Sequence, residues 1–488
     1  MIVGIAFGTS FSEMATLYAN QLFLLLNPGE YGIPSEFYYD GENGILVGQD
    51  ALDAGQGTAA ANLVSEIKMG LLSGKTYTLD GRTFTAKDIV KEIDRYVLTR
   101  AMAVAQKQRI PDSIEGLVIS VPAKFGMQEC DLIAEAARDA LPGKRLPIRG
   151  ILKEPVAAAI SYYRTGLPNG TRVLVYDLGG GTCDIALVEA DDTAKEHYTV
   201  IDSDMLRLGG RDWDRALISF ITGQIEKKSG VTVAGNIGYE EKIRRAAIAA
   251  KHDLSDSTKT RTIARVEING QIYPIPISRA TFDELTMNLL AQTLDATEAM
   301  YGKYPENYVG EIICVGGASN MLQVEEGLRE RFPGCQIRLF APEHAVVNGA
   351  ALYASLLQNT GSAGVTDIAA FSYGVEAMSK NGSAVISNII KQGDTLPATV
   401  TRAYHPIADG QGCVIFSIYE TDAADDEIAA DFSAKRPVGD VTLALPPNAP
   451  RDLTLHCEFT LDANGMLSVT AKEATGQRVN ATFDLKTL

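Results

Sequence analysis

The chain has 488 residues, of which 46% are hydrophobic and 22% are charged, proportions typical of a soluble globular protein. At roughly 100–200 residues per domain, this length predicts about three or four domain-sized units. Acidic residues outnumber basic ones by 61 to 44, which gives a formal net charge of -17. Such a surplus repels nucleic acid and anionic membranes, so neither is an expected partner. Solubility is the simplest explanation of the acidity.

Neither a membrane span nor an export signal is predicted. The densest apolar run, at 22–26, is far shorter than the roughly 20 residues that cross a bilayer. The N-terminus lacks a basic region followed by an apolar stretch. The six cysteines form no CxxC pair, and the five histidines show no metal-like spacing. We therefore expect reduced thiols, no zinc site and a cytoplasmic location.

Strands and helices alternate over the first three quarters of the sequence. Apolar runs predict strands at 2–7 and at 115–121, the second closed by Pro122. A helix is expected at 128–141, where apolar residues share one face. Further on, strands at 172–177 and 183–189 form a hairpin, and helices are expected at 239–254 and 322–332, the latter after a buried strand at 311–315. This alternation predicts an α/β domain.

The character of the sequence changes near residue 360. Residues 359–364 are small, polar and turn-prone, as in a linker. Beyond 371 the pattern predicts strands at 413–419, 452–461, 465–471 and 478–485, with a glycine hairpin turn at 462–465. We therefore expect an α/β domain at 1–358, a linker at 359–370 and an all-β domain at 371–488.

The sharpest motif is a glycine turn flanked by carboxylates, Asp177-Leu178-Gly179-Gly180-Gly181-Thr182-Cys183-Asp184. Backbone N–H groups in such a turn can hold phosphate oxygens, because glycine lets them approach without a side chain in between. Asp177 and Asp184 would hold Mg²⁺ or a monovalent cation, directly or through water. A tight hairpin with solvated aspartates is the structural alternative, and the two flanking carboxylates favour phosphate binding over it.

Two weaker glycine motifs repeat the idea. Gly4-Ile5-Ala6-Phe7-Gly8-Thr9-Ser10 combines a strand, a glycine turn and hydroxyls, but Ala6 stands at the carboxylate position. An ordinary hairpin is an equal interpretation. Val315-Gly316-Gly317-Ala318-Ser319 ends a buried strand and enters a helix, which suits close approach to an α-phosphate or a ribose but also occurs for purely structural reasons. Taken alone, Lys68 is most simply a solvated charge. Glu154 is most simply an acid at the start of a helix.

Taken in order, these segments resemble the seventy-kilodalton heat-shock chaperones of the DnaK type. The resemblance is colinear over essentially the whole chain. The matching stretches are 4–12, 46–49, 67–68, 118–125, 154–159, 175–185, 208–214, 250–251, 254–255, 315–321, 348–352, 374–376, 396–397 and 459–472.

The resemblance implies a two-lobed, actin-like α/β ATPase domain, an apolar linker, a β-sandwich that holds extended peptides, and a helical lid. ATP would lie between the lobes, with Mg²⁺ and K⁺ as expected cations. Thr9, Ser10, Gly180, Gly181 and Thr182 would contact the β- and γ-phosphates, within the turns that also contain Gly8 and Gly179. Asp177 and Asp184 would organise the cations. Lys68 would face the γ-phosphate and the attacking water, and Glu154 would orient the water shell of the metal.

Further roles follow from the same resemblance. The residues that would hold ribose, adenine and α-phosphate are Lys251, Ser255, Gly316, Gly317 and Ser319, and the matching 208–214 segment adds Gly209 and Gly210 to the nucleotide site. Pro122 falls on the position that relays the nucleotide state to the linker. The residues on or near the peptide groove are Phe371, Tyr373, Val375, Met378, Tyr404, Ile407, Val414 and Phe416. Plain sandwich core is the alternative for all eight, and for Val414 both interpretations stay open.

The sequence departs from the family pattern at several points. The first loop has Ala6 in place of an aspartate, and because phosphoryl transfer depends on positioning and charge stabilisation, hydrolysis should be slower by orders of magnitude. Ile248 replaces a ribose-contacting glutamate, and Asn320 replaces a basic residue that packs on adenine. The 367–370 segment is less apolar than the family linker, which weakens docking. No lid segment follows the last predicted strand, so peptide release should be fast.

Three functions are compatible with these features. The first is a divergent chaperone of the heat-shock, stress-response and protein-folding type, which binds ATP/ADP and unfolded segments with slow or absent turnover. J-domain and nucleotide-exchange co-chaperones are its expected partners. The second is a non-hydrolysing pseudo-ATPase scaffold, or a co-chaperone, that docks one fixed partner; Ala6, Ile248 and Asn320 favour it. A sugar kinase on the same scaffold is a distant third, because the C-terminus is β-rich.

Overall fold

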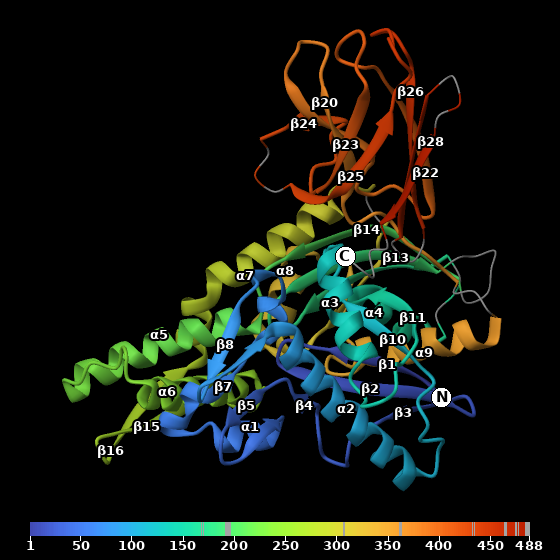
Figure 1. Ribbon diagram of the computed structural model, residues 1–488. Coiled ribbons are helices and arrows are strands. Elements are labelled where there is room, and N and C mark those ends of the chain that lie inside the picture. The colour runs from blue at the N-terminus through green and yellow to red at the C-terminus, as the bar shows by residue number, and fades with distance from the viewer. Residues whose placement is uncertain are drawn as a thin grey trace. The chain divides into compact units, whose positions relative to one another are not determined.

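The computed structural model describes residues 1–166, 168, 170–190, 197–305, 308–360, 364–431, 433, 435–462, 466–473, 476 and 478–483. Two units are present. The first consists of Met1–Ala123, Leu132–Lys195 and Asp204–Ala363, and the second of Lys124–Asp131, Glu196–Ser203 and Gly364–Leu488. The first unit mixes helices and strands, whereas the long C-terminal segment of the second is built from strands (Figure 1).

The first unit begins with a mixed sheet. A hairpin of β1 (Ile2–Phe7) and β2 (Phe11–Tyr18) is antiparallel, and β10 (Gly116–Val121) and β11 (Ile148–Lys153) add to β1 in parallel. The short strands β3 (Gln21–Leu24) and β4 (Ile33–Pro34) both pair with β2. Every residue of β10 is buried, as expected for a parallel strand covered on both faces.

A second mixed sheet repeats this topology. The antiparallel hairpin is formed by β12 (Arg172–Leu178) and β13 (Cys183–Ala190), and β17 (Glu311–Val315) and β18 (Gln336–Leu339) continue from β12 in parallel. In the second unit, β19 (Val365–Thr366) pairs in parallel with the start of β14 (Tyr198–Leu206). In both sheets a glycine turn joins the first two strands, so the two turns occupy equivalent positions.

Two helices join the sheets by close packing. Helices α4 (Glu154–Tyr163) and α9 (Ala345–Thr360) cross, and α9 also lies against β1 and β2. A Cβ built on Gly349 would overlap the carbonyl oxygen of Ala157, so only glycine lets these backbones approach this closely. The α4 residues 155–163 are all buried. This crossing fixes the two sheets, and therefore their glycine turns, relative to one another.

Further helices and small sheets precede the C-terminal segment, and residues 127–131 of one helix, α3, belong to the second unit. Helix α2 begins with a capping box between Thr85 and Asp88, and Asn236 caps α6. The helices are α1 (Gln49–Ala54), η1 (Gly57–Asn62), η2 (Ile67–Ser73), α2 (Ala86–Gln108), α3 (Met127–Arg138), α5 (Gly210–Ser229), α6 (Ile237–Ser255), α7 (Arg279–Tyr301), η3 (Gly317–Asn320) and α8 (Leu322–Arg331). The small sheets contain β5 (Phe37–Asp40), β6 (Gly44–Val47), β7 (Leu63–Val64), β8 (Thr76–Leu79), β9 (Arg82–Thr85), β15 (Arg261–Ile268) and β16 (Gln271–Ser278).

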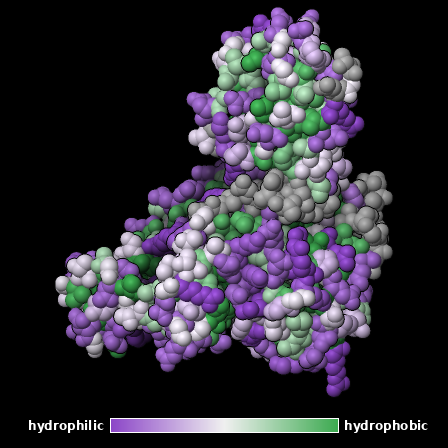
Figure 2. Space-filling view, in the orientation of Figure 1, coloured by the Kyte–Doolittle hydropathy of each residue, from purple (hydrophilic) through white to green (hydrophobic). Residues whose placement is uncertain are grey.

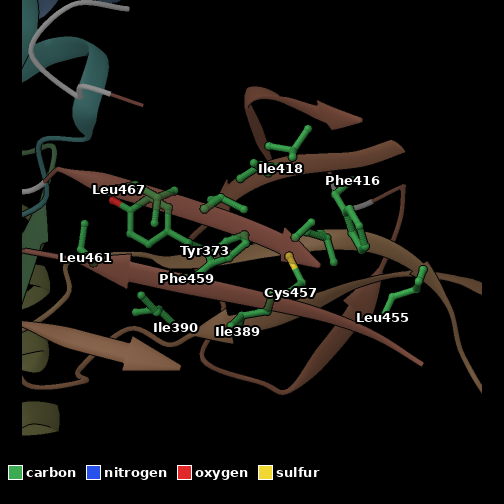
Figure 3. Close-up of a cluster of buried hydrophobic side chains, with 14 of the residues drawn as sticks. Tyr373, Ile389, Ile390, Phe416, Ile418, Leu455, Cys457, Phe459, Leu461 and Leu467 are labelled. Carbon is green, nitrogen blue, oxygen red and sulfur yellow. The ribbon is translucent and has the colours of Figure 1, made fainter. Parts of the chain in front are cut away.

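The C-terminal segment forms two antiparallel sheets around one apolar core. One sheet has the order β24-β21-β20-β23-β25 and the other β22-β26-β27-β28. Phe416 and Ile418 from the first sheet, and Leu455, Cys457 and Phe459 from the second, belong to one buried cluster (Figure 3). The strands are β20 (Ser372–Met378), β21 (Ala384–Ile390), β22 (Ala398–Tyr404), β23 (Cys413–Thr421), β24 (Glu427–Ala429), β25 (Arg436–Ala444), β26 (Leu455–Leu461), β27 (Leu467–Glu473) and β28 (Arg478–Phe483).

Most of the predicted elements are present with shifted ends. The strands expected at 2–7 and 311–315 match β1 and β17 residue for residue. The helix expected at 128–141 is α3 and ends three residues earlier, and that expected at 239–254 is α6 and starts two residues earlier. Helix α9 runs through Thr360, into the segment expected to start the linker. The predicted hairpin turn at 462–465 lies outside the described residues except for Asp462.

Hydrophilic side chains dominate the face of the molecule shown in Figure 2, with hydrophobic ones scattered among them. This distribution agrees with the excess of acidic residues in the sequence. Some carboxyl groups are buried, among them that of Asp94. Asp94 on α2 is completely buried, and neither of its side-chain oxygens has a hydrogen-bond partner in the described part of the chain. Burial raises the pKa of Asp94 well above its ordinary value, because charge is disfavoured in an apolar surrounding.

Asp94 therefore makes stability depend on pH. A raised pKa in the folded state means that the folded chain holds a proton that the unfolded chain releases, so stability is lost as pH rises from about 4 through the folded pKa. We expect Asp94→Asn to be more stable than the native chain at pH 8, by about 1–3 kcal/mol in unfolding free energy, with the difference shrinking at pH 5. Urea unfolding at both pH values measures this. An equal gain at both pH values would contradict a titrating Asp94.

Candidate functional site

The two glycine turns of the first unit meet. The turn at Gly8–Ser10 joins β1 to β2, and the turn at Gly179–Thr182 joins β12 to β13, closed by a 2.9 Å hydrogen bond from N of Gly179 to O of Thr182. A Cβ built on Gly180 would overlap Oγ of Ser10 and would lie 3.6 Å from the Ser10 nitrogen. Glycine at position 180 is therefore what lets hydroxyls of one turn face the backbone of the other.

The first turn is held in place from behind. Oγ of Ser35 donates to O of Gly8 at 2.8 Å, and N of Ser35 donates to O of Ser10 at 2.9 Å. The hydroxyl of Ser12 lies 2.9 Å from that of Ser35. These bonds use the carbonyl groups of Gly8 and Ser10. Thr9 and Ser10 are partly exposed. The turn can present donor groups without moving.

The start of helix α5 supports the second turn. N of Gly210 donates to O of Gly179 at 2.9 Å, and N of Arg211 donates to O of Gly180 at 3.0 Å. A Cβ built on Gly209 would lie 2.6 Å from C of Gly180 and from N of Gly181, so glycine is required there as well. Gly209 and Gly210 thus pack against the back of the turn and fix its carbonyls.

Two carboxylates face each other beside the second turn. Asp177 and Asp184 are direct cross-strand partners on β12 and β13, and both are buried. N of Ala123, which follows Pro122 at the end of β10, donates to Oδ1 of Asp184 at 2.6 Å. Oδ2 of Asp184 is buried and has no hydrogen-bond partner among the described residues. A buried, incompletely satisfied carboxylate of this kind is suited to a cation or to a cation-bound water.

A buried ion pair completes the acidic cluster. Nζ of Lys68, on η2, lies 2.6 Å from Oε1 of Glu154, the first residue of α4. The Lys68 side chain is only 3% exposed. Because Glu154 neutralises and orients it, the ammonium of Lys68 is fixed near Asp177 and Asp184, whose pKa values it lowers.

The cluster remains short of positive charge. Burial, above all, raises the pKa of Asp177 well above its usual range, and the carboxylates of Glu154 and Asp184 raise it further. Burial and Glu154 likewise raise the pKa of Asp184 to about 7, although the hydrogen bonds from Thr182 and Ala123 oppose the shift. One ammonium thus serves three carboxylates, an arrangement that favours binding of a cation.

The third glycine motif lies against the same carboxylate. Gly316 has φ of 81°, and a Cβ built on it would overlap Oδ1 of Asp177 and the carbonyl oxygen of Leu178. Both the backbone conformation and the space require glycine. Gly317 is exposed at the start of η3. The strand–glycine–helix joint therefore approaches the acidic cluster closely.

The polar residues expected around a nucleoside already have protein partners. Oγ of Ser319 is buried and donates to O of Val315 at 2.6 Å, and Oγ of Ser255 donates to O of Lys251 at 2.9 Å. Nζ of Lys251 donates to O of Gly210 at 3.0 Å and pairs with Asp214 at 2.9 Å. Lys251 thus braces the start of α5, behind the second turn.

The three single-residue departures from the family pattern, Ala6, Ile248 and Asn320, have defined surroundings. Ala6 lies opposite Ser120 on β10 and opposite Glu13 on β2. Nδ2 of Asn320 donates to Oε1 of Glu343 at 2.8 Å and to O of Gly317 at 3.2 Å. Ile248 is partly buried on α6. None of the three substitutes restores a charge at its position.

The residues proposed for a peptide groove fall into three groups. Phe371, Tyr373, Val375 and Phe416 are buried in the apolar core of the two C-terminal sheets, where Figure 3 labels Tyr373 and Phe416. Tyr404 and Val414 are partly buried and pack on that core. Met378 and Ile407 are 55% and 67% exposed. Core packing thus explains the first group, and only the others are open to contact.

Several residues of the site were not singled out from the sequence. Arg211 and Asp214 lie within the 208–214 match, for which the resemblance implies a role only at Gly209 and Gly210. Glu66 pairs with Arg211, and Oε2 of Glu13 lies 3.1 Å from Nδ1 of His344. None of Glu66, Glu13 and His344 has a local sequence signal, since an isolated charge resembles any solvated one. Ile415, 57% exposed between Val414 and Phe416, was detectable from strand alternation, because its neighbours on both sides were expected to face inward.

Comparisons with known proteins agree with this geometry. A profile of the Hsp70 protein family matches residues 72–486. The chain belongs to the Hsp70 family. The resemblance inferred from the sequence is thereby confirmed.

Individual relatives of this Hsp70 chain are ribosome-associated molecular chaperones from fungi. The chaperone of this name from Eremothecium gossypii is 31% identical over 412 residues, which cover 80% of this chain and 64% of the relative. Its counterpart from Zygosaccharomyces rouxii is 30% identical over 426 residues, covering 83% and 65% respectively. The chain thus spans slightly less than two thirds of the length of these relatives.

The Hsp70 chain offers no protein-only metal cage in the ranges that the structure describes. There, no group of three or more His, Cys, Asp or Glu side chains is close enough to hold a metal ion. A cation at Asp177 and Asp184 would therefore need further ligands from a bound phosphate or from water. None of the helices in the described part of the chain has the length and apolarity that crossing a bilayer requires.

The contact between the turns makes a direct prediction. We expect Gly180→Ala to destabilise the first unit by about 1–3 kcal/mol, because the added methyl group overlaps Ser10 and pushes the two turns apart. Gly223→Ala is the matched control: Gly223 lies within α5 with open space around its Cβ position, so the same change there should stabilise by about 0.5–1 kcal/mol. Urea unfolding compares the two variants, and equal behaviour would refute the close contact.

Proposed function

We propose that this chain is an ATP-binding molecular chaperone of the Hsp70 type that holds extended or unfolded polypeptide segments and hydrolyses ATP slowly. The observation that carries the proposal is the meeting of the two glycine turns at Gly180 and Ser10, beside Asp184 with its unpartnered oxygen. Backbone donors from two turns and a cation-seeking carboxylate are the groups that a polyphosphate requires. Family membership supports a nucleotide as the source of the phosphates.

The residues present fit a nucleotide with its cation. Gly180, Gly209 and Gly316 have no room for a Cβ atom, so they keep the chain closely packed around the turns, and Thr9, Ser10 and Thr182 would supply hydroxyls to the phosphates. Asp177 and Asp184 would hold Mg²⁺, with K⁺ as a second expected cation. Bound Mg²⁺ would neutralise charge that develops on the transferred phosphoryl group.

The protein groups would act by positioning and charge. Lys68, oriented by Glu154, would face the γ-phosphate and the attacking water, and it brings the positive charge that the buried carboxylates lack. Thr182 would hold a phosphate oxygen, and its backbone carbonyl stays bonded to Gly179. Without a carboxylate at Ala6, one cation ligand is missing, so hydrolysis should be slower by orders of magnitude.

The C-terminal sheets would bind peptides. Tyr404, Val414, Met378 and Ile407 remain available for contact, together with Ile415. Extended, apolar segments of unfolded proteins are the expected ligands, and J-domain and nucleotide-exchange co-chaperones are expected partners. The relatives are named for ribosome association. With a net charge of -17, any such contact by this chain would be with protein rather than with the RNA backbone.

Pro122 is suited to relay the nucleotide state. It is buried at the end of β10 and precedes Ala123, whose N–H bonds to Asp184. A change at the cation site would therefore reach the end of β10 through one hydrogen bond. A cytoplasmic location and a role in stress response are part of the same proposal.

A pseudo-ATPase scaffold is the second candidate. Ser255, Ser319 and Lys251 are bonded to the protein itself, and Ile248 and Asn320 offer no charge to a nucleoside. These observations favour a weaker grip on ribose and adenine than the phosphate turns provide. In this case nucleotide would stabilise the fold, and the β sheets would dock one fixed partner.

Calorimetry with ATP and Mg²⁺ tests the proposal first. We expect a dissociation constant in the nanomolar-to-micromolar range, which corresponds to roughly 8–12 kcal/mol of binding free energy. ADP should bind as well, since the turns grip its phosphates. If neither nucleotide gives a heat of binding, the ATP-binding proposal is wrong.

Restoring the first carboxylate separates the two candidates. We expect Ala6→Asp to raise single-turnover hydrolysis of ATP by at least about tenfold, since one missing cation ligand is supplied again. Ala6→Asn is the matched control, because it adds similar volume without charge. If Ala6→Asp hydrolyses no faster than Ala6→Asn while ATP still binds, the scaffold function is favoured.

Peptide binding has its own test. We expect Ile407→Asp to weaken binding of a fluorescein-labelled, leucine-rich extended peptide about tenfold, because burying an isoleucine contributes about 1.5–3 kcal/mol. Ile272→Asp is the control, since Ile272 is similarly exposed but belongs to β16 of the first unit. Fluorescence anisotropy measures both. Equal loss in the two variants would argue against a groove at Ile407.

A further inference from the structure

An ion pair lies beside the two glycine turns of the first unit. It joins the two lobes of this unit, by which we mean the part around the β1–β2 hairpin and the part around the β12–β13 hairpin. Glu66 directly precedes η2, the short helix that carries Lys68, and its carboxylate pairs with Nη1 of Arg211 at the start of α5. The same carboxylate lies 3.4 Å from Nη2 of Arg215, one helical turn further on. Glu66 thus reaches from the first lobe to the helix that supports the second glycine turn.

Arg211 is bound to the glycine turn itself. Its Nε donates to O of Gly180 at 3.2 Å, and its backbone N donates to the same oxygen at 3.0 Å. The side chain is only 11% exposed, whereas that of Arg215 is 59% exposed. Arg211 therefore fixes Gly180, the residue that touches Ser10, and holds Glu66 at its other end.

The backbone at Glu66 indicates that this contact is held against a conformational preference. Glu66 has φ of 64°, a left-handed conformation that non-glycine residues seldom adopt and that surrounding contacts must enforce. Around the pair, Arg215, Asp212 and Asp214 act on Arg211, and Glu36 and Arg244 interact with Glu66. A guanidinium this deeply buried is stable only when a carboxylate stays beside it, so separation of the lobes at this point carries a penalty.

We propose that the Glu66–Arg211 pair is a clasp that positions the Lys68 helix and the Gly180 turn around bound phosphates and must open before nucleotide leaves. Arg211 is a positioning residue, acting through Gly180, and Glu66 acts through the backbone that leads to Lys68. This inference rests on the proposed nucleotide binding. It assigns to this ion pair the control of nucleotide exchange.

Release of a fluorescent ADP analogue, mant-ADP, tests the clasp. We expect Glu66→Gln and Arg211→Gln each to release mant-ADP about tenfold faster, the factor that corresponds to about 1.4 kcal/mol. The double variant should be no faster than the single ones, because each removes the same pair. Arg215→Gln is the matched control and should change release less than about twofold, since an exposed pair contributes little.

Salt dependence distinguishes a clasp from a structural role. Release from the native chain should accelerate with added salt, because the Glu66 carboxylate is partly exposed and its attraction to Arg211 is screened; Glu66→Gln should lose this dependence. Unchanged release in both single variants, or equal effects of Arg215→Gln and Arg211→Gln, would overturn the clasp.

A ligand-free measurement keeps the inference separable from nucleotide binding. Hydrogen exchange of the backbone amides at 64–74 should be faster in Glu66→Gln and Arg211→Gln than in the native chain and in Arg215→Gln. If the native chain does not bind mant-ADP, the proposed function fails, whereas this exchange difference still decides whether the clasp holds the lobes together. No difference in exchange would overturn it.

Discussion

Buried negative charge is the constraint on which the first unit depends. Asp177 and Asp184 face each other on one hairpin, Glu154 lies nearby, and Lys68 is the one ammonium that acts on both aspartates within the described site. Carboxylates in an apolar surrounding are stable only with opposite charge or with hydrogen-bond donors. The Ala123 N–H, the Lys68–Glu154 pair and the glycine turns supply part of this compensation. The uncompensated remainder of the negative charge is the physical reason to expect a cation at this place.

The two large sheets of the first unit share one topology, and this places the glycine turns and carboxylates of the site. In each sheet an antiparallel hairpin with a glycine turn is extended by two parallel strands, so each lobe offers one turn. The crossing of α4 and α9 at Gly349 then fixes the turns relative to each other. Glycine is required where backbones approach, at positions 209, 316 and 349, and at position 180 an added methyl group would overlap the Ser10 hydroxyl. The site is thus a consequence of how closely the two lobes pack.

The sequence predicted the parts of this arrangement that depend on local pattern. Strands β1 and β17, the Asp177–Asp184 turn and the glycine joint at 316–317 follow from apolar runs and from glycine between carboxylates. Contacts between distant segments were not predictable in this way. Glu66 and Arg211 are 145 positions apart in the numbering, and each alone looks like a solvated charge. The residues predicted for a peptide groove divide into buried and exposed groups, which the sequence did not separate. Alternation along a strand assigns side chains to two faces but does not say which face another sheet covers.

The surroundings of Ala6 explain why its substitution is not simply repaired by a neighbour. Glu13 is its cross-strand partner and lies on the same face of the hairpin. However, Oε2 of Glu13 lies 3.1 Å from Nδ1 of His344, just before α9. The hydrogen bond to Glu13 raises the pKa of His344, and burial raises the pKa of Glu13. The carboxylate nearest to Ala6 in register is therefore committed to joining β2 to α9. On the proposed function, a site that has both glycine turns and Lys68, but whose adjacent acid is used structurally, would retain nucleotide more readily than hydrolyse it.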